Sequence, residues 1–253
     1  MSQCNACQEP LVIRVDDDDE GANGQPVTVP DDLELQCGCH FHWECFMEEA
    51  SSVAISSKCP GCESYLPVNE AGPSTATNTS LQSPSTAPIL ARYCNEGGVQ
   101  DRLDILPSIT EEAYVQNNPE VRPARAFHLM CSEGDVTGMI ELLYDVQGDI
   151  GDAGPLVLYQ DPLAEMKSAL HLAVENKQSE AIWLLLWLAS TVPLDSFPPS
   201  ARQSAETVGI RRLAVESGVD IRALRDAHGR SAENLAHQNA GFWRQLLDTG
   251  VLS

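Results

Sequence analysis

The stretch Cys37-Gly38-Cys39-His40-Phe41-His42-Trp43-Glu44-Cys45 decides the fold of the N-terminal part of this chain. Two shorter motifs flank it, Cys4-x2-Cys7 and Cys59-x2-Cys62. Each C-x2-C motif puts two thiolates on one tight turn, so both can face one ion. Two closed tetrahedral zinc sites need eight ligands, and the spacing supplies them: Cys4, Cys7, Cys37, Cys39, His42, Cys45, Cys59 and Cys62.

The composition of the N-terminal part indicates that these residues bind metal. Residues 1–70 contain 14 acidic side chains and only two basic ones, Arg14 and Lys58. A segment this short and polar buries too little apolar surface to fold alone. Two Zn²⁺ ions would supply the missing folding free energy, about 10 kcal/mol or more per site. A disulfide framework is the alternative, but no signal peptide precedes Cys4, so we expect reduced thiols and bound zinc.

The central stretch and the closing Cys59-Pro60-Gly61-Cys62 resemble a RING finger. That family reads Cys-x-His-x-Phe-His-x2-Cys in its two-histidine form and closes with Cys-Pro-x-Cys. Cys39 stands at its first histidine position and His42 at its second. The resemblance covers residues 4–62 and implies cross-brace topology. One zinc ion would be held by Cys4, Cys7, His42 and Cys45, and the other by Cys37, Cys39, Cys59 and Cys62.

Two related modules fit the spacing less well. PHD fingers leave a longer gap before the histidine and carry a Trp where Ser57 stands. The variant RING of membrane-bound ligases also has a longer gap before its histidine. His40 is a poor ligand because only Phe41 separates it from His42, so we expect a loop side chain there. Phe41 and Phe46 are predicted to form the small apolar core.

The resemblance also implies a function. RING fingers bind a ubiquitin-conjugating enzyme that carries thioester-linked ubiquitin, and they hold the thioester ready for attack, which is catalysis by positioning. No residue of this chain needs to be catalytic. The candidate contacts with the conjugating enzyme are Ala6, Leu11, Val53 and Pro60. Three positions depart from the family pattern, where Ile, Trp and Arg are common: Ala6, Glu49 and Glu63.

The connecting segments have distinct compositions. Residues 11–15 and 26–30 are rich in β-branched side chains and predict two strands joined by an acidic tip that begins at Asp16. Residues 71–92 are rich in Ser, Thr and Pro and predict a flexible linker. Residues 93–121 are predicted to form a helical cap that covers the C-terminal half.

Residues 122–253 contain an internal repeat. The segment around His128 recurs 43 residues later around His171, and a weaker copy surrounds Asn234. Ser168-Ala169-Leu170-His171-Leu172-Ala173 resembles the ankyrin motif Thr-Pro-Leu-His-x-Ala, which implies an all-α stack of about three repeats that binds proteins. Insertions over 146–163 and 191–202 stretch the usual period, and a helix is expected near 204–217. His128 and His171 are interpreted as buried hydrogen-bonding residues.

The sequence therefore predicts a small α+β zinc-bound RING-like domain (1–70) followed by an all-α ankyrin-repeat stack (122–253). A net charge of −22 argues against direct nucleic-acid binding. The apolar run 181–189 is too short to cross a membrane. We expect a cytoplasmic or nuclear protein that is not secreted.

The expected function is that of a RING-type E3 ubiquitin ligase. The zinc domain would bind the charged conjugating enzyme, and the repeats would bind the protein substrate. Two alternatives remain open. One is a non-catalytic zinc-finger and ankyrin adaptor. The other is a PHD-like reader of histone tails, in which the acidic zinc domain would bind a basic peptide.

Overall fold

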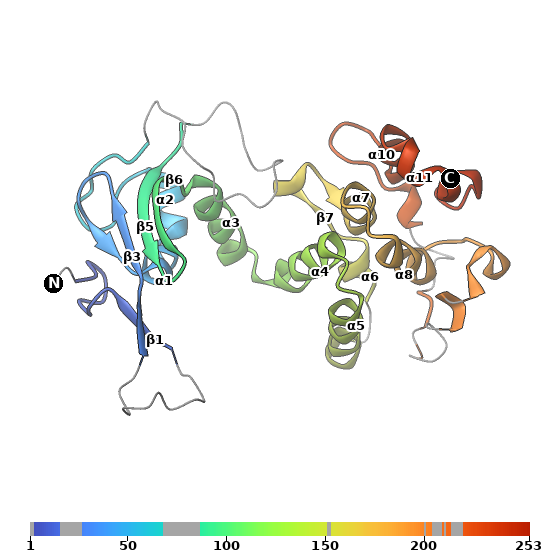
Figure 1. Ribbon diagram of the computed structural model, residues 1–253, viewed down its shortest axis with the longest axis horizontal. Helices are drawn as coiled ribbons and strands as arrows, with labels where there is room; N and C mark the ends of the chain where they lie inside the picture. Colours follow the sequence, from blue (N-terminus) through green and yellow to red (C-terminus); the bar gives the residue numbers. More distant parts are fainter. Residues whose placement is uncertain are drawn as a thin grey trace. The chain divides into compact units, whose positions relative to one another are not determined.

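The computed structural model describes residues 3–15, 27–67, 87–150, 153–199, 201–203, 209, 211–213 and 220–253 (Figure 1). The chain divides into two compact units, Met1–Pro119 and Glu120–Ser253. The described residues combine small sheets with short helices, so the chain is mixed α/β. Each unit has its own cluster of buried apolar side chains. None of the described helices is long and apolar enough to span a bilayer.

The described residues of the first unit form two antiparallel sheets. Strand β1 (Val12–Val15) pairs with β2 (Val27–Pro30), which confirms the predicted strand pair. The acidic tip between them lies outside the described residues. The larger sheet has the order β4-β3-β5-β6. Its strands are β3 (Asp32–Leu35), β4 (His40–Phe41), β5 (Leu90–Asn95) and β6 (Gly98–Asp104).

The segment that follows residue 86 completes this unit. The sequence predicts a linker over 71–92 and a helical cap on the repeats over 93–121, whereas the structure places the described part of both segments, as far as Pro119, in the first unit. Strand β5 pairs with β3 along Asp32–Leu35, and β6 pairs with β5. The physical reason is apolar burial, because four side chains of this segment are buried in the core that surrounds Phe41: Ile89, Leu103, Ile105 and Ile109. Residues 71–86 of the predicted linker, and residues 68–70 before it, lie outside the described residues.

Three of the described helices pack in the first unit. Helices α1 (Trp43–Met47) and α2 (Ala50–Ser56) follow β4, and α3 (Leu106–Asn117) follows β6. Side chains join α3 to the two shorter helices. Ser51 Oγ donates to Gln116 Oε1 at 2.7 Å, and Gln116 Nε2 donates to the carbonyl of Met47 at 2.9 Å. These contacts and the packed apolar core hold α3 against the segment that carries Cys45.

Three helix–turn–helix pairs make up most of the described part of the second unit. They are α4 (Arg122–Glu133) with α5 (Val136–Ile150), α7 (Ala169–Glu175) with α8 (Ser179–Ala189), and α10 (Ala232–Gln238) with α11 (Ala240–Asp248). The turn after α4 has Gly134 at φ 79°, a left-handed conformation in which glycine carries no Cβ penalty. The predicted repeat in the sequence thus corresponds to a repeated helix pair.

Capping residues explain where the later pairs begin. Ser168 and His171 form a reciprocal capping box at the start of α7, and Ser231 and Asn234 do the same for α10. His171 Nε2 donates to the carbonyl of Arg230 at 2.9 Å, which joins the second copy to the third. Both predicted histidines are buried. In the first copy Arg125 stands at the position of the capping serine and forms a partly buried ion pair with Asp161 at 2.6 Å.

The expected insertions contain short elements. Helix α6 (Gly154–Val157) and the hairpin β7 (Gln160–Asp161) with β8 (Lys167–Ser168) follow α5, and the 3-10 helix η3 (Pro162–Ala164) lies between the two strands. A 3-10 helix, η4 (Leu194–Ser196), follows α8 and places Phe197 against Trp183 and Trp187. Most of the helix expected near 204–217 lies outside the described residues, and 211–213 are not helical.

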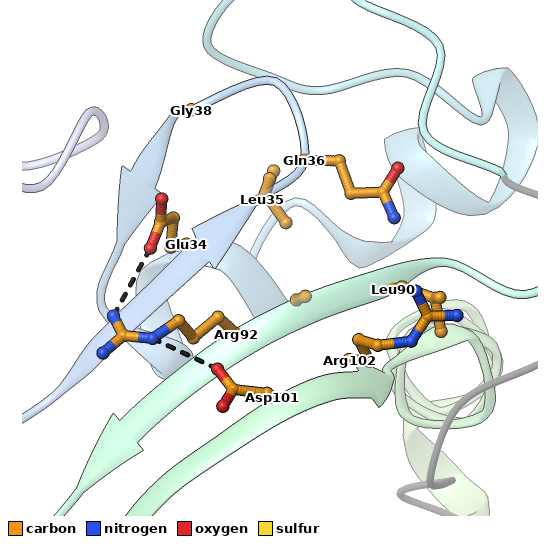
Figure 2. Close-up of a pocket in the computed structure, with 9 residues that line it drawn as sticks. Glu34, Leu35, Gln36, Gly38, Leu90, Arg92, Asp101 and Arg102 are labelled. Atoms are coloured by element: carbon orange, nitrogen blue, oxygen red, sulfur yellow. Dashed lines mark hydrogen bonds and ion pairs between the residues drawn. The ribbon is translucent and has the colours of Figure 1, made fainter.

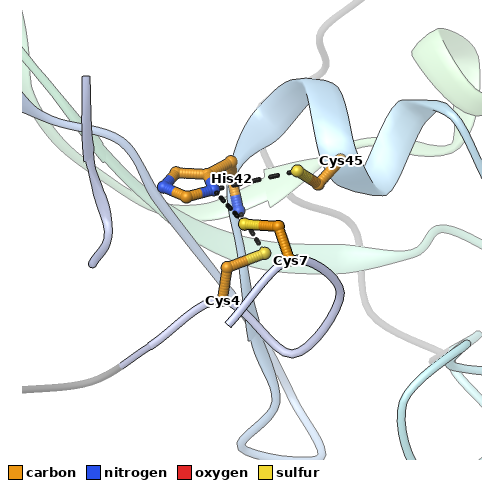
Figure 3. A group of neighbouring side chains, drawn as sticks. All are labelled: Cys4, Cys7, His42 and Cys45. Carbon is orange, nitrogen blue, oxygen red and sulfur yellow. Dashed lines mark hydrogen bonds between the residues drawn. The ribbon is translucent and has the colours of Figure 1, made fainter. Parts of the chain in front are cut away.

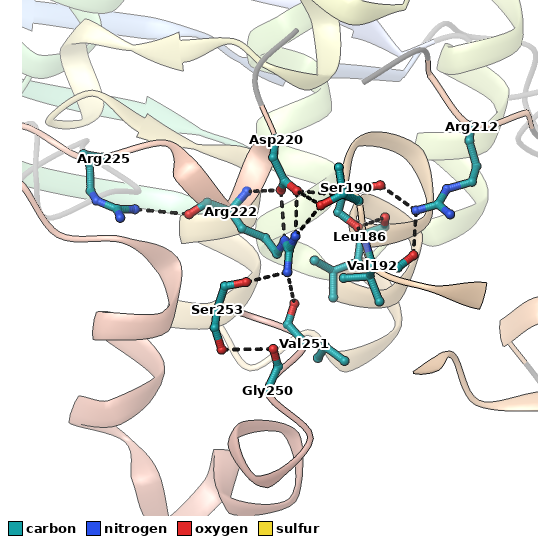
Figure 4. Close-up of polar contacts among 11 residues, drawn as sticks. Leu186, Ser190, Val192, Arg212, Asp220, Arg222, Arg225, Gly250, Val251 and Ser253 are labelled. Carbon is teal, nitrogen blue, oxygen red and sulfur yellow. Dashed lines mark hydrogen bonds and ion pairs between the residues drawn. The ribbon is translucent and has the colours of Figure 1, made fainter. Parts of the chain in front are cut away.

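Polar contacts hold the C-terminal segment against the end of α8 (Figure 4). The 3-10 helix η6 (Ile221–Ala223) carries Arg222, which donates to Asp220 and to the carbonyl of Ser253. Arg212 donates to the carbonyls of Trp187 and Val192 near the end of α8. Burial opposes ionisation of Asp220, but hydrogen bonds from Arg222 and Thr191 outweigh it and lower the pKa of that carboxyl. Arginine therefore satisfies carbonyl groups that a helix end leaves exposed.

Acidification is expected to destabilise the second unit through His128. Its Nε2 donates to the carbonyl of Tyr159, and burial lowers its pKa to about 4. The unfolded chain binds a proton at this histidine near pH 6.5, whereas the folded chain binds one only near pH 4. The stabilisation that comes from the neutral imidazole is therefore complete above pH 6.5, and it decreases by up to about 3 kcal/mol as the pH falls toward 4. Amide exchange of α7 at pH 7 and pH 4.5 measures the loss.

His128→Gln should reduce this acid sensitivity, because it removes one of the two buried histidines whose pKa burial lowers, the other being His171. His237→Gln, at an exposed position on α10, is the matched control and should keep the full sensitivity. Equal acid sensitivity in the wild type and His128→Gln would exclude His128 as its source.

Candidate metal centres

Two turns with the same backbone pattern carry the C-x2-C motifs. The amide of Gln8 donates to the carbonyl of Cys4, and the amide of Glu63 donates to the carbonyl of Cys59, both at 2.9 Å. Gln8 has φ 65° and Glu63 has φ 59°, so both turns end in a left-handed residue. The amide of each first cysteine donates in turn to the carbonyl five residues later, at Glu9 and at Ser64. These bonds close each motif and bring its two sulfur atoms together.

The first cluster joins the N-terminal turn to the start of α1 (Figure 3). It consists of Cys4, Cys7, His42 and Cys45, whose ligand atoms all lie within 4.8 Å of one another. His42 Nδ1 lies 3.3 Å from Cys7 Sγ and 3.8 Å from Cys45 Sγ. The other ring nitrogen, Nε2, lies 2.9 Å from the carbonyl of Pro10 and can donate to it. That bond leaves Nδ1 unprotonated and directed at the sulfur atoms, as a metal-binding imidazole requires.

The second cluster joins the β3–β4 turn to the second C-x2-C motif. It consists of Cys37, Cys39, Cys59 and Cys62, and its sulfur atoms also lie within 4.8 Å of one another. Gly38 separates the first two and has φ 80°, which turns the chain between them. Ser64 Oγ lies 3.2 Å from Cys62 Sγ. The division into two groups of four is the one that the resemblance to a RING finger implies.

The ligand atoms of both clusters are close enough to share one ion each, and the distances around His42 fit a tetrahedral ion. With metal–sulfur bonds of about 2.3 Å and metal–nitrogen bonds of about 2.0 Å, sulfur–nitrogen contacts of about 3.5 Å are expected. The distances of 3.3 and 3.8 Å around His42 Nδ1 bracket this value. Sulfur and imidazole donors in a closed tetrahedral set suit Zn²⁺ or an iron–sulfur centre. Each cluster could therefore hold one metal ion.

The thiols of each cluster compete for ionisation. Burial acts to raise the pKa of Cys4, but amide hydrogen bonds from Cys7, His42 and Ala6 outweigh it and lower the value to about 7. Hydrogen bonds from Ser64 lower the pKa of Cys62 to about 6. Burial and the neighbouring thiols raise the pKa of Cys45 to about 12 and also raise that of Cys39. A bound divalent cation would allow all the thiols of a cluster to ionise together, because its charge stabilises each thiolate.

The aromatic residues near the clusters take structural positions. Phe41 and Phe46 are almost fully buried, with ring centroids 5.5 Å apart, which confirms their predicted core role. Trp43 is half-buried and its ring packs against Tyr93 at 5.0 Å. His40 belongs to neither cluster and its Nδ1 lies 2.7 Å from Asp32 Oδ1.

The candidate contacts with a conjugating enzyme divide into two pairs. Ala6 and Pro60 are exposed, one on each C-x2-C turn. Leu11 is 8% exposed and Val53 is 1% exposed, and both belong to the core of the first unit. A partner cannot reach these two side chains, so Leu11 and Val53 are corrected from docking residues to core residues.

Two supporting residues were not predicted from the sequence. The carbonyl of Pro10 orients His42, and the carboxylate of Asp31 accepts the amide of Trp43 at 3.2 Å and the hydroxyl of Tyr93 at 3.0 Å. Asp31 thereby holds the start of α1, which carries Cys45, against β5. Burial first and Asp31 second raise the pKa of Tyr93, which keeps its hydroxyl a donor. No local sequence signal could indicate a contact between residues so far apart in the chain.

Comparisons of the chain with protein-family models, with curated proteins and with solved structures give no match. The two clusters are therefore identified from their own geometry and donor chemistry.

A shallow hollow is lined by residues of β3, β5 and β6 and by Gln36 and Gly38, which flank Cys37 in the sequence (Figure 2). It has a volume of about 270 Å³ and lies where β5 and β6 shift register. Arg102 occupies the shift with φ 57°, a left-handed conformation. Arg92 lies 3.4 Å from Glu34 and 3.3 Å from Asp101, so ion pairs cross the hollow. These exposed ion pairs join side chains of β3, β5 and β6, and the lining of the hollow contains no nucleophile.

Proposed function

We propose that this chain is a RING-type E3 ubiquitin ligase whose two zinc ions are structural. The main support for this proposal is that the ligands of the two clusters alternate along the sequence. Cys37 and Cys39 of the second cluster lie between the two halves of the first, Cys4–Cys7 and His42–Cys45. Interleaved ligand pairs are what a cross-brace needs, and the C-x-C-x2-H-x2-C and C-P-x-C spacings support the same module.

The proposed mechanism uses position alone. Ala6 and Pro60 are exposed on the two C-x2-C turns and offer the docking surface for a charged conjugating enzyme. Docking would hold the ubiquitin thioester in an orientation in which an amine can attack its carbonyl carbon. Such ordering of the reactants raises the rate of ubiquitin transfer. The attacking amine comes from the substrate, so this chain supplies no nucleophile. The zinc ions would hold the two turns in place.

We further propose that the helix pairs of the second unit are divergent ankyrin repeats that bind the substrate. The capping boxes at Ser168 and Ser231, the buried His171 and the β7–β8 hairpin support this assignment. The tip of that hairpin, Glu165–Met166, has left-handed backbone at both residues, and Met166 is 38% exposed. An exposed hairpin beside short helices provides the kind of surface through which repeat proteins bind partners.

A non-catalytic adaptor is the second candidate. It is favoured by Glu49 and Glu63, which are exposed where ligases of this family commonly carry Trp and Arg. Two carboxylates there weaken the expected grip on the conjugating enzyme and on ubiquitin. An adaptor would bind proteins through both units and would not promote the transfer of ubiquitin.

The deciding experiment measures discharge of ubiquitin from charged conjugating enzymes onto free lysine, with the zinc-loaded full chain and a panel of enzymes. The ligase proposal predicts at least a tenfold faster discharge with one or more enzymes. Ala6→Arg should remove this gain, because a long cation at the exposed position 6 blocks docking. Ala223→Arg, at an exposed position of the second unit, is the matched control and should leave the rate unchanged. No faster discharge with any enzyme, on protein shown to be folded, would support the adaptor.

A further inference from the structure

The chain contains very few primary amines. Its fifteen basic side chains comprise three lysines, Lys58, Lys167 and Lys177, and twelve arginines. All three lysines lie in described segments, so their surroundings are known. A ubiquitin thioester is attacked by a neutral amine, and arginine cannot replace lysine in that step because its guanidinium stays protonated. If the proposed function is correct, these few lysines decide where the ligase can modify itself.

Lys167 is enclosed. Its side chain is 7% exposed, and its Nζ lies 3.0 Å from Glu175 Oε2 and 3.5 Å from Glu165 Oε2. Residue 167 also lies in β8, paired with Asp161 of β7. A bulky thioester carbonyl cannot reach an amine between two carboxylates in a folded hairpin. Self-modification at Lys167 would require the hairpin to open.

Lys177 is open to solvent. It lies in the turn between α7 and α8, with φ 62°, and its residue is exposed. Its Nζ lies 5.5 Å from the centroid of the Phe242 ring, which is itself 54% exposed. A contact with one exposed ring leaves the ammonium free to turn toward an incoming thioester. Lys177 is therefore an accessible amine on the second unit.

Lys58 is the accessible amine on the first unit. It lies between the end of α2 and Cys59, and its residue is exposed. Its backbone is fixed by a bridge to Tyr65 and by a hydrogen bond from its amide to Ser56 Oγ at 3.2 Å. These bonds use the main chain, so the side chain projects from an ordered turn.

We propose that self-ubiquitination of this chain is confined to Lys58 and Lys177. The inference rests on the proposed ligase function. In the step, the neutral Nζ attacks the thioester carbonyl that joins ubiquitin to the cysteine of the conjugating enzyme. The carbon–sulfur bond breaks, an isopeptide carbon–nitrogen bond forms, the cysteine leaves as thiolate, and the amine proton passes to solvent. Low lysine content would limit the loss of the ligase through its own activity.

The test uses the zinc-loaded full chain with ubiquitin, activating enzyme and the conjugating enzyme that gives the fastest discharge. Branched peptides found by mass spectrometry should map to Lys58 and Lys177. Lys58→Arg with Lys177→Arg should lower self-modification at least tenfold and leave discharge onto free lysine unchanged. Adding Arg244→Lys to that double variant places a new amine at an exposed position of α11 and should restore self-modification.

The outcomes separate the two proposals. No discharge with any enzyme overturns the ligase function, and self-modification with it. Discharge together with branches at Lys167, or with self-modification undiminished in the double variant, overturns only the acceptor assignment. Amine acetylation of the untreated chain gives an independent readout, since Lys58 and Lys177 should react at least tenfold faster than Lys167, and equal rates would contradict the burial of Lys167.

Discussion

Cys59→Ser is expected to unfold the first unit and to leave the second unit folded. Cys59 is buried in the second cluster and also belongs to the apolar core. Serine is a poor ligand for a soft-donor zinc site, so the site would lose most of a binding free energy on the order of 10 kcal/mol, which exceeds the stability of most small domains. Amide exchange followed along the chain should show loss of protection in β3 and β5 and retained protection in α7 and α8.

Cys94→Ser is the matched control for this substitution. Cys94 lies half-buried in β5 of the same unit and belongs to neither cluster. Its replacement removes a small thiol without removing a ligand, so we expect a loss of about 1 kcal/mol or less. Equal loss of protection in both variants would show that the first unit depends on cysteine packing and not on bound metal.

Truncation after Pro67 is expected to leave the N-terminal module without a stable fold, even with zinc present. The shortened chain lacks β5, β6 and α3. It therefore exposes the edge of β3 that pairs with Ala91–Cys94 in the full chain. It also loses four buried side chains, Ile89, Leu103, Ile105 and Ile109, each of which stabilises a core by about 1.5–3 kcal/mol. A chain that ends at Pro119 keeps all of these contacts and should fold.

Titration of both fragments with two equivalents of zinc, followed by amide spectra, measures this difference. The longer fragment should give dispersed resonances, and the shorter one should not. In the longer fragment, Ile105→Ala should cost about 2–5 kcal/mol because it empties a fully buried position. Val99→Ala on the exposed part of β6 is its control and should cost far less. A shorter fragment as well folded as the longer one would disprove the extended unit.

The sequence predicted the parts of the structure that local spacing determines. A C-x2-C motif fixes its own turn, so Cys4 with Cys7 and Cys59 with Cys62 could be paired without knowledge of the fold. The repeated segments around His128, His171 and Asn234 could be found in the same way, because each copy carries its pattern within one helix pair. The same reasoning identified Phe41 and Phe46 as core residues, because a zinc module this small has few apolar side chains to bury.

Long-range pairing could not be predicted in this way. The strand β5 pairs with β3 although residues 36–89 separate them in sequence. The residues of β5 were therefore predicted to lie in the linker and the cap, outside the first unit. Leu11 and Val53 were placed on the surface because their apolar character suits a docking site as well as a core. Only the tertiary structure distinguishes the two, since burial depends on what else packs there.

A count of metal ions per chain tests the central claim most directly. Elemental analysis of the purified full-length protein, prepared without added chelator, should find two zinc ions per molecule. Mild treatment with a chelator should remove both and abolish the protection of β3 and β5. One ion, or none in a protein whose first unit is still folded, would contradict the assignment of both clusters as metal centres.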